Sequence, residues 1–382
     1  MELTPEQLKR VYKSALQLSY SVIILGPPGV GKTASIHDFA YELAKKEKIP
    51  LLEPSDFETL SEFNQKCPNG NCVLFVYLNL NTILPIDIGG VPEKIREDER
   101  TAVAWIPLVT WLACKQSRYC VIVLDEFNTV ENPDVMAMAM RLMSEHRAGN
   151  IKIHTNKNKV LVVALGNPPQ FSSIAKPLPA PLLGGKALVV HAKPPTIQQW
   201  IEWMVRRHGS AWHRPIAGAI AAFPEIFVKV PESEETLEPY PTPRGWTKAA
   251  RLCYFDPERC EMYIQALCGN EAVSVYQQYK NMVVDDLEDI LRMKPEERVL
   301  KLIIWATKKY CDANEKQFKL LADRATADEL AVITYITSGL CPSKNNQLYK
   351  LLPDEKRKTV FSDRYTMRET EIKGENPLGD VI

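Results

Sequence analysis

The sequence lacks an excess of charge of either sign and lacks a long hydrophobic run. Its 382 residues carry 47 lysines and arginines against 47 aspartates and glutamates, so no global positive field draws the chain to nucleic acid or to an anionic membrane. No stretch approaches the roughly 18 consecutive apolar residues of a membrane span, and the first residues lack the basic and then apolar layout of a secretory signal. We therefore expect a cytoplasmic protein with no membrane span, and we do not expect nucleic acid as its partner.

The sequence also has few candidate metal ligands. Its nine cysteines are spread over the chain, and Cys67 and Cys72 form the one tight pair. A zinc site needs about four ligands, and no second Cys or His pair has the spacing of a zinc finger, so a metal at this pair is the less favoured alternative. Because a reducing compartment keeps thiols free, we expect most cysteines to be small core residues and this pair to flank a plain turn before a strand.

The remaining composition, 45% hydrophobic and 25% charged, is typical of a globular protein of two or three folding units. Several apolar runs alternate with longer stretches and are typical of strands buried on both faces of a largely parallel sheet. These runs are 21–25, 73–78, 121–124, 159–165 and 187–190. An amphipathic helix is expected from Thr4 onwards. After Lys193-Pro194-Pro195 helical patterns take over, at about 196–208, 214–222, 244–254, 257–268, 270–291 and 296–311.

A glycine segment follows the first of these strands and precedes a helical pattern. It fits G-x-x-x-x-G-K-[ST], the phosphate-binding loop, and consists of Gly26, Pro27, Pro28, Gly29, Val30, Gly31, Lys32 and Thr33. The glycines let successive backbone N–H groups curl around phosphate oxygens, and the N-terminus of the following helix adds its dipole. Lys32 would supply charge at the β and γ phosphates, and Thr33 would offer a hydroxyl to Mg²⁺. The pattern therefore predicts a site for a nucleotide and Mg²⁺.

Two further strands end in polar side chains that suit such a site. The run 121–124 leads into Asp125 and Glu126, which look like a Walker B element. Asp125 would hold the Mg²⁺ shell, and Glu126 would orient and polarise the attacking water. The run 159–165 leads through Gly166 to Asn167, which Pro168-Pro169 prevents from continuing as a strand. An amide there can hydrogen-bond water and the γ-phosphate together, which is the sensor 1 role in AAA+ ATPases.

The ordered set of P-loop, Asp-Glu, Asn-Pro-Pro and helical second part resembles AAA+ ATPases, and finer features resemble the MoxR-like branch. The resemblance spans about 20–300. The similar segments are Ile86–Pro92, Trp105–Leu108, the helix-like Asp134–Gly149, and Thr242-Pro243-Arg244, which is similar to the "SPR" sensor 2. It implies Mg²⁺-dependent ATP hydrolysis, a catalytic role for Arg244, and a homo-oligomeric ring, in this family often a hexamer. It further implies remodelling of a protein client, for which a von Willebrand A-domain protein is the expected partner.

One segment departs from this branch. Where an arginine finger is expected to reach the neighbouring subunit's nucleotide, the chain has Lys186. We take Lys186 as a candidate catalytic residue, although a lysine cannot clamp phosphate with a planar fork. Arg141 or Arg147 acting in trans, or slow hydrolysis, are the alternatives left open.

These observations predict an α/β fold, a P-loop NTPase parallel sheet sandwiched by helices and followed by an all-α lid domain. The expected domains are an N-terminal helix at 1–18, the nucleotide-binding domain at 19–192, the lid at 193–300 and a helical C-terminal extension of unknown role at 301–382. Two other functions stay open: a DNA-related AAA+ motor or loader, which the zero net charge disfavours, and a slow nucleotide-gated scaffold, which the missing finger favours.

Overall fold

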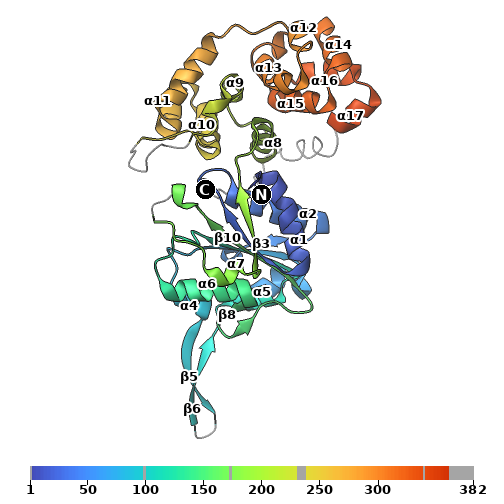
Figure 1. Cartoon of the computed structure of the whole chain (residues 1–382). Helices are drawn as coiled ribbons and strands as arrows, with labels where there is room; N and C mark the ends of the chain where they lie inside the picture. Colours follow the sequence, from blue (N-terminus) through green and yellow to red (C-terminus); the bar gives the residue numbers. More distant parts are fainter. Residues whose placement is uncertain (1, 98–99, 172–173, 230–237, 339, 361–382) are drawn as a thin grey trace. The chain divides into compact units, whose positions relative to one another are not determined.

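The computed structural model describes residues 2–97, 100–171, 174–229, 238–338 and 340–360 (Figure 1). The chain divides into two compact units, Met1–Pro194 and Pro195–Ile382. The first contains the sheet and the second consists of helices. The expected fold class, a parallel sheet between helices followed by an all-helical region, is therefore confirmed.

Seven parallel strands form the sheet of the first unit, in the order β1-β11-β2-β10-β7-β4-β3. Their bounds are β1 Glu2–Leu3, β2 Ser21–Leu25, β3 Leu51–Leu52, β4 Val73–Asn79, β7 Tyr119–Asp125, β10 Lys159–Gly166 and β11 Ala187–Ala192. In the register, Gly166 pairs with Leu25 of β2, and Ala164 pairs with Leu124 of β7. The carboxyl ends of β2, β7 and β10 therefore meet at one edge of the sheet, which is where open α/β sheets bind ligands.

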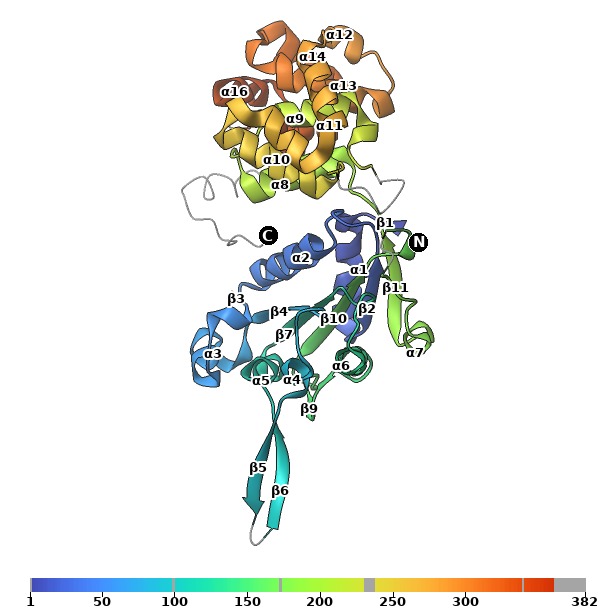
Figure 2. The ribbon, with the colours of Figure 1, turned by 90° about the vertical axis from the view of Figure 1, so that its left-hand side faces the viewer.

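Helices cover both faces of this sheet, as the uninterrupted apolar runs predict. One core contains Val121 and Val163 with residues of α1 (Pro5–Leu18) and α2 (Lys32–Glu47). The other contains Ile122 and Val162, and the remaining helices of this unit lie on or near that side. They are α3 Leu60–Lys66, α4 Pro85–Gly89, α5 Val109–Gln116, α6 Pro133–Glu145 and α7 Ala180–Leu183. Figure 2 shows α1 and α2 on one side of the strands and α5 and α6 on the other.

Two hairpins of the first unit were not expected from the sequence. The longer joins β5 (Val91–Glu97) to β6 (Arg100–Ile106) and extends away from the sheet (Figures 1 and 2). The shorter pairs β8 Arg147–Ala148 with β9 Ile151–Lys152. At the base of the longer hairpin Gly90 has φ 86°, and a Cβ there would lie 2.5 Å from the Ile106 carbonyl oxygen. Two of the four segments that resemble the MoxR-like branch, Ile86–Pro92 and Trp105–Leu108, thus meet at the base of one hairpin.

Cysteine pairing differs from the expectation of free thiols. Cys67 and Cys72 are joined by a disulfide, and so are two further pairs, Cys253–Cys260 and Cys311–Cys341. The turn between Cys67 and Cys72 does occur, as a 3-10 turn at Pro68–Gly70 directly before β4. The expectation failed because their spacing of five residues, folded into this tight turn, brings the two Cα atoms to 5.5 Å, a separation that a disulfide spans.

Helices of the second unit share one continuous core. They are α8 Ile197–His208, α9 Pro215–Ala222, α10 Pro243–Phe255, α11 Cys260–Asn281, α12 Leu287–Ile290, α13 Pro295–Lys308, α14 Glu315–Arg324, α15 Ala327–Thr337, α16 Pro342–Leu351 and α17 Asp354–Val360. Residue 300, where we expected the lid to end, lies inside α13. In place of the two expected helices 257–268 and 270–291 there is α11, kinked at Gly269, and the separate short α12. Among the described helices of both units, none combines the length and apolar character needed to cross a bilayer.

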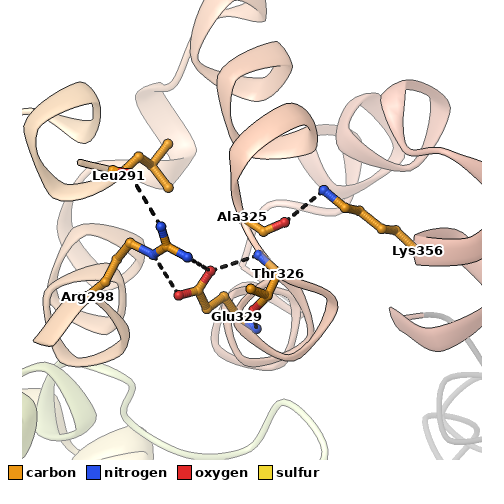
Figure 3. A network of polar contacts seen from close by, with 6 residues as sticks. All are labelled: Leu291, Arg298, Ala325, Thr326, Glu329 and Lys356. Carbon is orange, nitrogen blue, oxygen red and sulfur yellow. Dashed lines mark hydrogen bonds and ion pairs between the residues drawn. The ribbon is translucent and has the colours of Figure 1, made fainter. Parts of the chain in front are cut away.

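A buried ion pair connects the helices on either side of residue 310 (Figure 3). Arg298 of α13 donates to both carboxylate oxygens of Glu329 on α15, at 2.7 and 2.9 Å. Glu329 also accepts from the backbone N–H of Thr326 at 2.8 Å. Nearby, Lys356 of α17 donates to the carbonyl oxygen of Ala325 at 2.8 Å. The described residues between 301 and 360 therefore share one core with the helices before them.

Candidate nucleotide-binding site

The P-loop connects β2 to α2 at the carboxyl edge of the sheet. Gly29 and Gly31 have φ values of 75° and 92°, a left-handed conformation that favours glycine. Gly26 is required for a different reason, because a Cβ there would lie 2.6 Å from the Ala192 carbonyl oxygen of β11. Gly31 is the N-cap of α2 and forms no side-chain cap, so the first N–H groups of the helix are available to an anion. The loop therefore has the backbone shape that holds phosphate.

Lys32 connects this loop to the neighbouring strand end. Its Nζ donates to the carbonyl oxygens of Gly26 and Pro27 at 2.6 and 3.0 Å, and to Oδ1 of Asn167 at 2.8 Å. The ammonium group and the Asn167 amide, which are 135 residues apart in the sequence, therefore lie in hydrogen-bond contact. Both were predicted from the sequence as phosphate-contacting groups.

Asp125 is the meeting point of three donors. Thr33 Oγ1 of the P-loop lies 3.4 Å from its Oδ2, and Tyr77 Oη of β4 donates to the same oxygen at 2.8 Å. The backbone N–H of Glu126 donates to Oδ1 at 2.9 Å. A hydroxyl beside a carboxylate is a suitable pair of oxygen donors for Mg²⁺, and these are the two residues that the sequence assigned to the metal. Tyr77 was not anticipated, because its contact depends on the pairing of β4 with β7.

Glu126 lies in a turn after β7, and the chain that follows it contacts β10. Its φ is 58°, which is uncommon for a residue with a side chain, and the next N–H, that of Phe127, donates to the Leu165 carbonyl oxygen at 2.8 Å. Thr129 Oγ1 lies 3.1 Å from Glu126 Oε2 and accepts from Asn81 Nδ2 at 2.9 Å. The carboxylate is therefore held by a short chain of hydrogen bonds that sequence reasoning missed.

Asn167 follows β10 and is held by another amide. Asn128 Oδ1 accepts from the backbone N–H of Asn167 at 3.1 Å, and Asn128 Nδ2 donates to its carbonyl oxygen at 2.7 Å. Asn128 is 3% exposed. The only signal in the sequence was its position, three residues after Asp125.

The candidate trans-acting cations lie toward the amino ends of the strands, at the opposite end from the P-loop. Lys186 directly precedes β11, whose first residue pairs with Ser21, the first residue of β2. The five residues of β2 separate the amino end of this strand from the P-loop by roughly 16 Å along the strand. Arg141 and Arg147 both lie near Glu145, at 3.2 and 3.9 Å, at the end of α6. That end lies near Ser21, whose hydroxyl donates to the Met143 carbonyl oxygen at 2.6 Å.

Arg244 belongs to the second unit. It lies in the first turn of α10, which Thr242 caps by accepting from the N–H of Gly245 at 3.0 Å, and its side chain is exposed. Its expected role at the nucleotide stays a prediction.

No protein-family model and no curated protein matches the sequence. Solved structures similar to it include the ORC2 protein of Aeropyrum pernix, in ADPNP and ADP complexes, at 13% identity over 98% of this chain and 96% of that one, with a TM-score of 0.33. Cdc6p of Pyrobaculum aerophilum is 13% identical over 95% and 85% of the two chains, with a TM-score of 0.34. The Hsp104-ADP complex of S. cerevisiae is 11% identical over 99% and 49%, with a TM-score of 0.36. Because TM-scores this low do not establish a common fold for the whole chains, we infer the function from the geometry of the site.

Proposed function

We propose that this chain is a Mg²⁺-dependent ATPase of the AAA+ type. The observation that carries the proposal is the convergence of Lys32, Thr33, Asp125, Glu126 and Asn167 at one edge of the sheet, around a glycine loop shaped for phosphate. These groups come from three separate strand ends, and together they supply a phosphate cation, a metal ligand pair, a carboxylate and a polar amide. That set corresponds to the needs of phosphoryl transfer from a nucleotide to water.

In this proposal each residue has a distinct task. The N–H groups at the start of α2 and the Lys32 ammonium bind the β and γ phosphates. Thr33 and Asp125 would hold Mg²⁺, which would neutralise charge on the phosphates. Glu126 accepts a hydrogen bond from the attacking water and takes its proton, while the Asn167 amide orients the water and the γ-phosphate. Thr129 keeps the Glu126 carboxylate in place.

The decisive experiment is the Glu126→Gln variant. Glutamine keeps the shape and the hydrogen bonds of Glu126 but cannot take a proton, so we expect ATP binding to be retained and turnover to fall by roughly 10²-fold or more. Glu131→Gln is the matched control, because Glu131 is an exposed glutamate five residues away, and it should hydrolyse ATP at the parent rate. A Glu126→Gln protein with parental turnover would show that the base lies elsewhere.

The proposal extends to assembly, following the MoxR-like resemblance. Lys186, Arg141 and Arg147 lie toward the amino ends of the strands, opposite their own P-loop, so they are better placed to serve a neighbouring subunit than their own. Two apolar residues of β11, Leu188 and Val189, are 41% and 37% exposed, which suits a contact between copies. A homo-oligomeric ring, taken here as a hexamer, would then couple hydrolysis to remodelling of a protein client such as a von Willebrand A-domain protein.

A second candidate function is a slow nucleotide-gated scaffold. It is favoured by one observation, the lysine at position 186 in place of a fork-shaped arginine. The two candidates differ in whether turnover depends on contact between subunits.

A further inference from the structure

The contact between Asn128 and Asn167 has an unusual form. The Asn128 side chain bonds both main-chain groups of Asn167, its N–H and its carbonyl, at 3.1 and 2.7 Å. This pattern is the one by which a neighbouring strand holds a residue, with a side-chain amide in place of a peptide group. Asn128 therefore extends the pairing of β10 by one residue beyond Gly166, where the strand ends.

The sequence after Asn167 explains why the main chain of Asn167 needs these two side-chain hydrogen bonds. Pro168 and Pro169 have no N–H groups, so they cannot donate to a neighbouring strand, and Asn167 is the last residue before them that can. Further along, the chain returns to the same place, since Lys176 donates from its N–H to the Asn128 carbonyl oxygen at 2.7 Å and from Nζ to that of Val130 at 2.9 Å. Asn128 thus contacts both the start and the end of the segment that follows β10.

Gly166 supplies an independent observation. A Cβ on Gly166 would lie 2.4 Å from Oδ1 and 2.9 Å from Cγ of Asn128, so a larger residue at 166 would push the amide away from Asn167. The glycine is not required for a left-handed backbone, because its φ lies outside that region. It is required by the close approach of the Asn128 amide.

These contacts to the main chain of Asn167 also affect the direction of its side chain. With both main-chain groups of Asn167 fixed, its amide can turn toward the P-loop, where Oδ1 accepts from Lys32 at 2.8 Å. We propose that Asn128 is a positioning residue that fixes the main chain of Asn167 and thereby sets where its amide meets the γ-phosphate of ATP. This inference rests on the proposed function, because it takes Asn167 to contact that phosphate.

Asn128→Asp tests the proposal with the smallest change. Aspartate keeps an acceptor for the Asn167 N–H but replaces the Nδ2 donor with an oxygen that faces the Asn167 carbonyl oxygen. We expect the affinity for a fluorescent ATP analogue to change less than about threefold and turnover to fall about tenfold or more. The preference for ATP over ADP should also fall, because in the proposed function Asn167 contacts the γ-phosphate, which ADP lacks. Thermal unfolding measured in parallel separates this from loss of fold.

Asn132→Asp is the matched control. Asn132 lies in the same segment, and its Oδ1 accepts from the N–H groups of Asp134 and Val135 at 2.9 and 3.3 Å. A carboxylate can accept both bonds and is favoured at a helix N-terminus. This variant should keep the parental turnover and the parental ATP-to-ADP preference.

Double-variant cycles separate positioning from general support of the fold. If Asn128 acts through Asn167, adding Asn128→Asp to Asn167→Ala should change turnover and nucleotide preference by less than about twofold beyond Asn167→Ala alone. Effects that multiply would overturn the positioning role. Asn128→Ala, which removes both bonds without adding a charge, gives the same test if the aspartate variant does not fold.

The outcomes also separate this inference from the proposed function. If Asn167→Ala itself leaves turnover and nucleotide preference unchanged, the role of Asn167 in the proposed function fails, and the positioning role fails with it. If Asn167→Ala is slow while both Asn128 variants are not, only the positioning role fails.

Discussion

At the scale of single residues, the site depends on side chains that contact one another across strand ends. Lys32 contacts two P-loop carbonyl oxygens and the Asn167 amide, so one ammonium group is shared between two elements of the site. The same acceptors place it where phosphate oxygens of a nucleotide would lie in the proposed function. Its removal should therefore affect binding before it affects chemistry.

We expect Lys32→Ala to lower nucleotide affinity about tenfold or more, because it removes the P-loop cation that faces the β and γ phosphates. Titration with a fluorescent ATP analogue measures this directly. Lys46→Ala, an exposed change in the last turn of α2, is the control and should bind as the parent does. Equal affinity of the two variants would contradict the P-loop assignment.

Another single residue makes stability depend on pH. Burial, and then the Arg214 cation, lower the pKa of His213 from 6.5 to about 4, and its Nε2 lies 2.8 Å from Tyr276 Oη. The unfolded chain takes up this proton near pH 6.5 and the folded chain only near pH 4, so the unfolded state binds more protons between these values. The stabilising contribution of neutral His213 is complete above pH 6.5 and is lost as the pH falls toward 4.

Melting temperatures of the parent and of His213→Asn across pH 4 to 7 check this expectation. The variant should be less stable at pH 7 and should lose less stability on acidification than the parent does. His191→Asn, on the exposed side of β11, should follow the parent curve. Parallel curves for parent and His213→Asn would show that the imidazole does not titrate differently on folding.

At the scale of elements, the α13–α15 contact contains a buried ion pair. Replacing only Arg298 would leave the Glu329 carboxylate buried without its partner, which typically costs about 3–5 kcal/mol. Arg298→Met should therefore strongly destabilise the second unit, whereas Arg298→Met combined with Glu329→Leu should recover much of the loss. Urea unfolding followed by tryptophan fluorescence suits this test, because five of the seven tryptophans lie in the second unit.

The exposed pair Arg292–Glu288 provides the control at similar distance, 2.8 Å, on the same unit. Exposed pairs contribute about 0–1 kcal/mol, so Arg292→Met should be nearly neutral. If Arg298→Met were as mild as Arg292→Met, the α13–α15 contact would not depend on the ion pair.

The same scale shows how far the sequence predicts the fold. All five apolar runs identified real strands. Those in β2, β7 and β10 are largely apolar because these strands are buried on both faces, whereas Leu188 and Val189 of β11 are partly exposed. The β5–β6 hairpin was missed because its strands, VPEKIRE and RTAVAWI, show no regular alternation of polar and apolar residues. Val91, Val103, Trp105 and Ile106 are 44–62% exposed, so these apolar residues do not mark a core. The lid boundary expected at residue 300 falls inside α13. No local pattern in the sequence shows that the core of the second unit joins helices on both sides of that position.

For the site, the sequence predicts residues whose role follows from a local pattern. The P-loop, Asp125, Glu126 and Asn167 each follow an apolar run, and parallel pairing brings such strand ends together. Tyr77, Thr129 and Asn128 have no motif of their own. Their roles depend on register, as when Tyr77 of β4 reaches Asp125 of β7 across 48 positions of sequence.

At the scale of the whole molecule, the proposed ring makes activity depend on concentration. If a cation from one subunit completes the next subunit's site, specific ATPase activity should rise as the protein assembles. Among Lys186→Ala, Arg141→Ala and Arg147→Ala, at least one should lower turnover more than about threefold, or roughly 0.65 kcal/mol of barrier. Activity independent of dilution, with three fully active variants, would favour the slow scaffold instead.

The P-loop and the candidate cations lie at opposite ends of the strands. Each copy therefore has two different surfaces that could meet, one with the nucleotide site and one with the cations. Two different surfaces associate head to tail, and such contacts close into a ring or continue as a filament. In a mixture, a copy without its donor cation would then hydrolyse ATP normally at its own P-loop and leave its neighbour slow. The chemical defect would therefore appear in a different molecule from the one that carries the substitution.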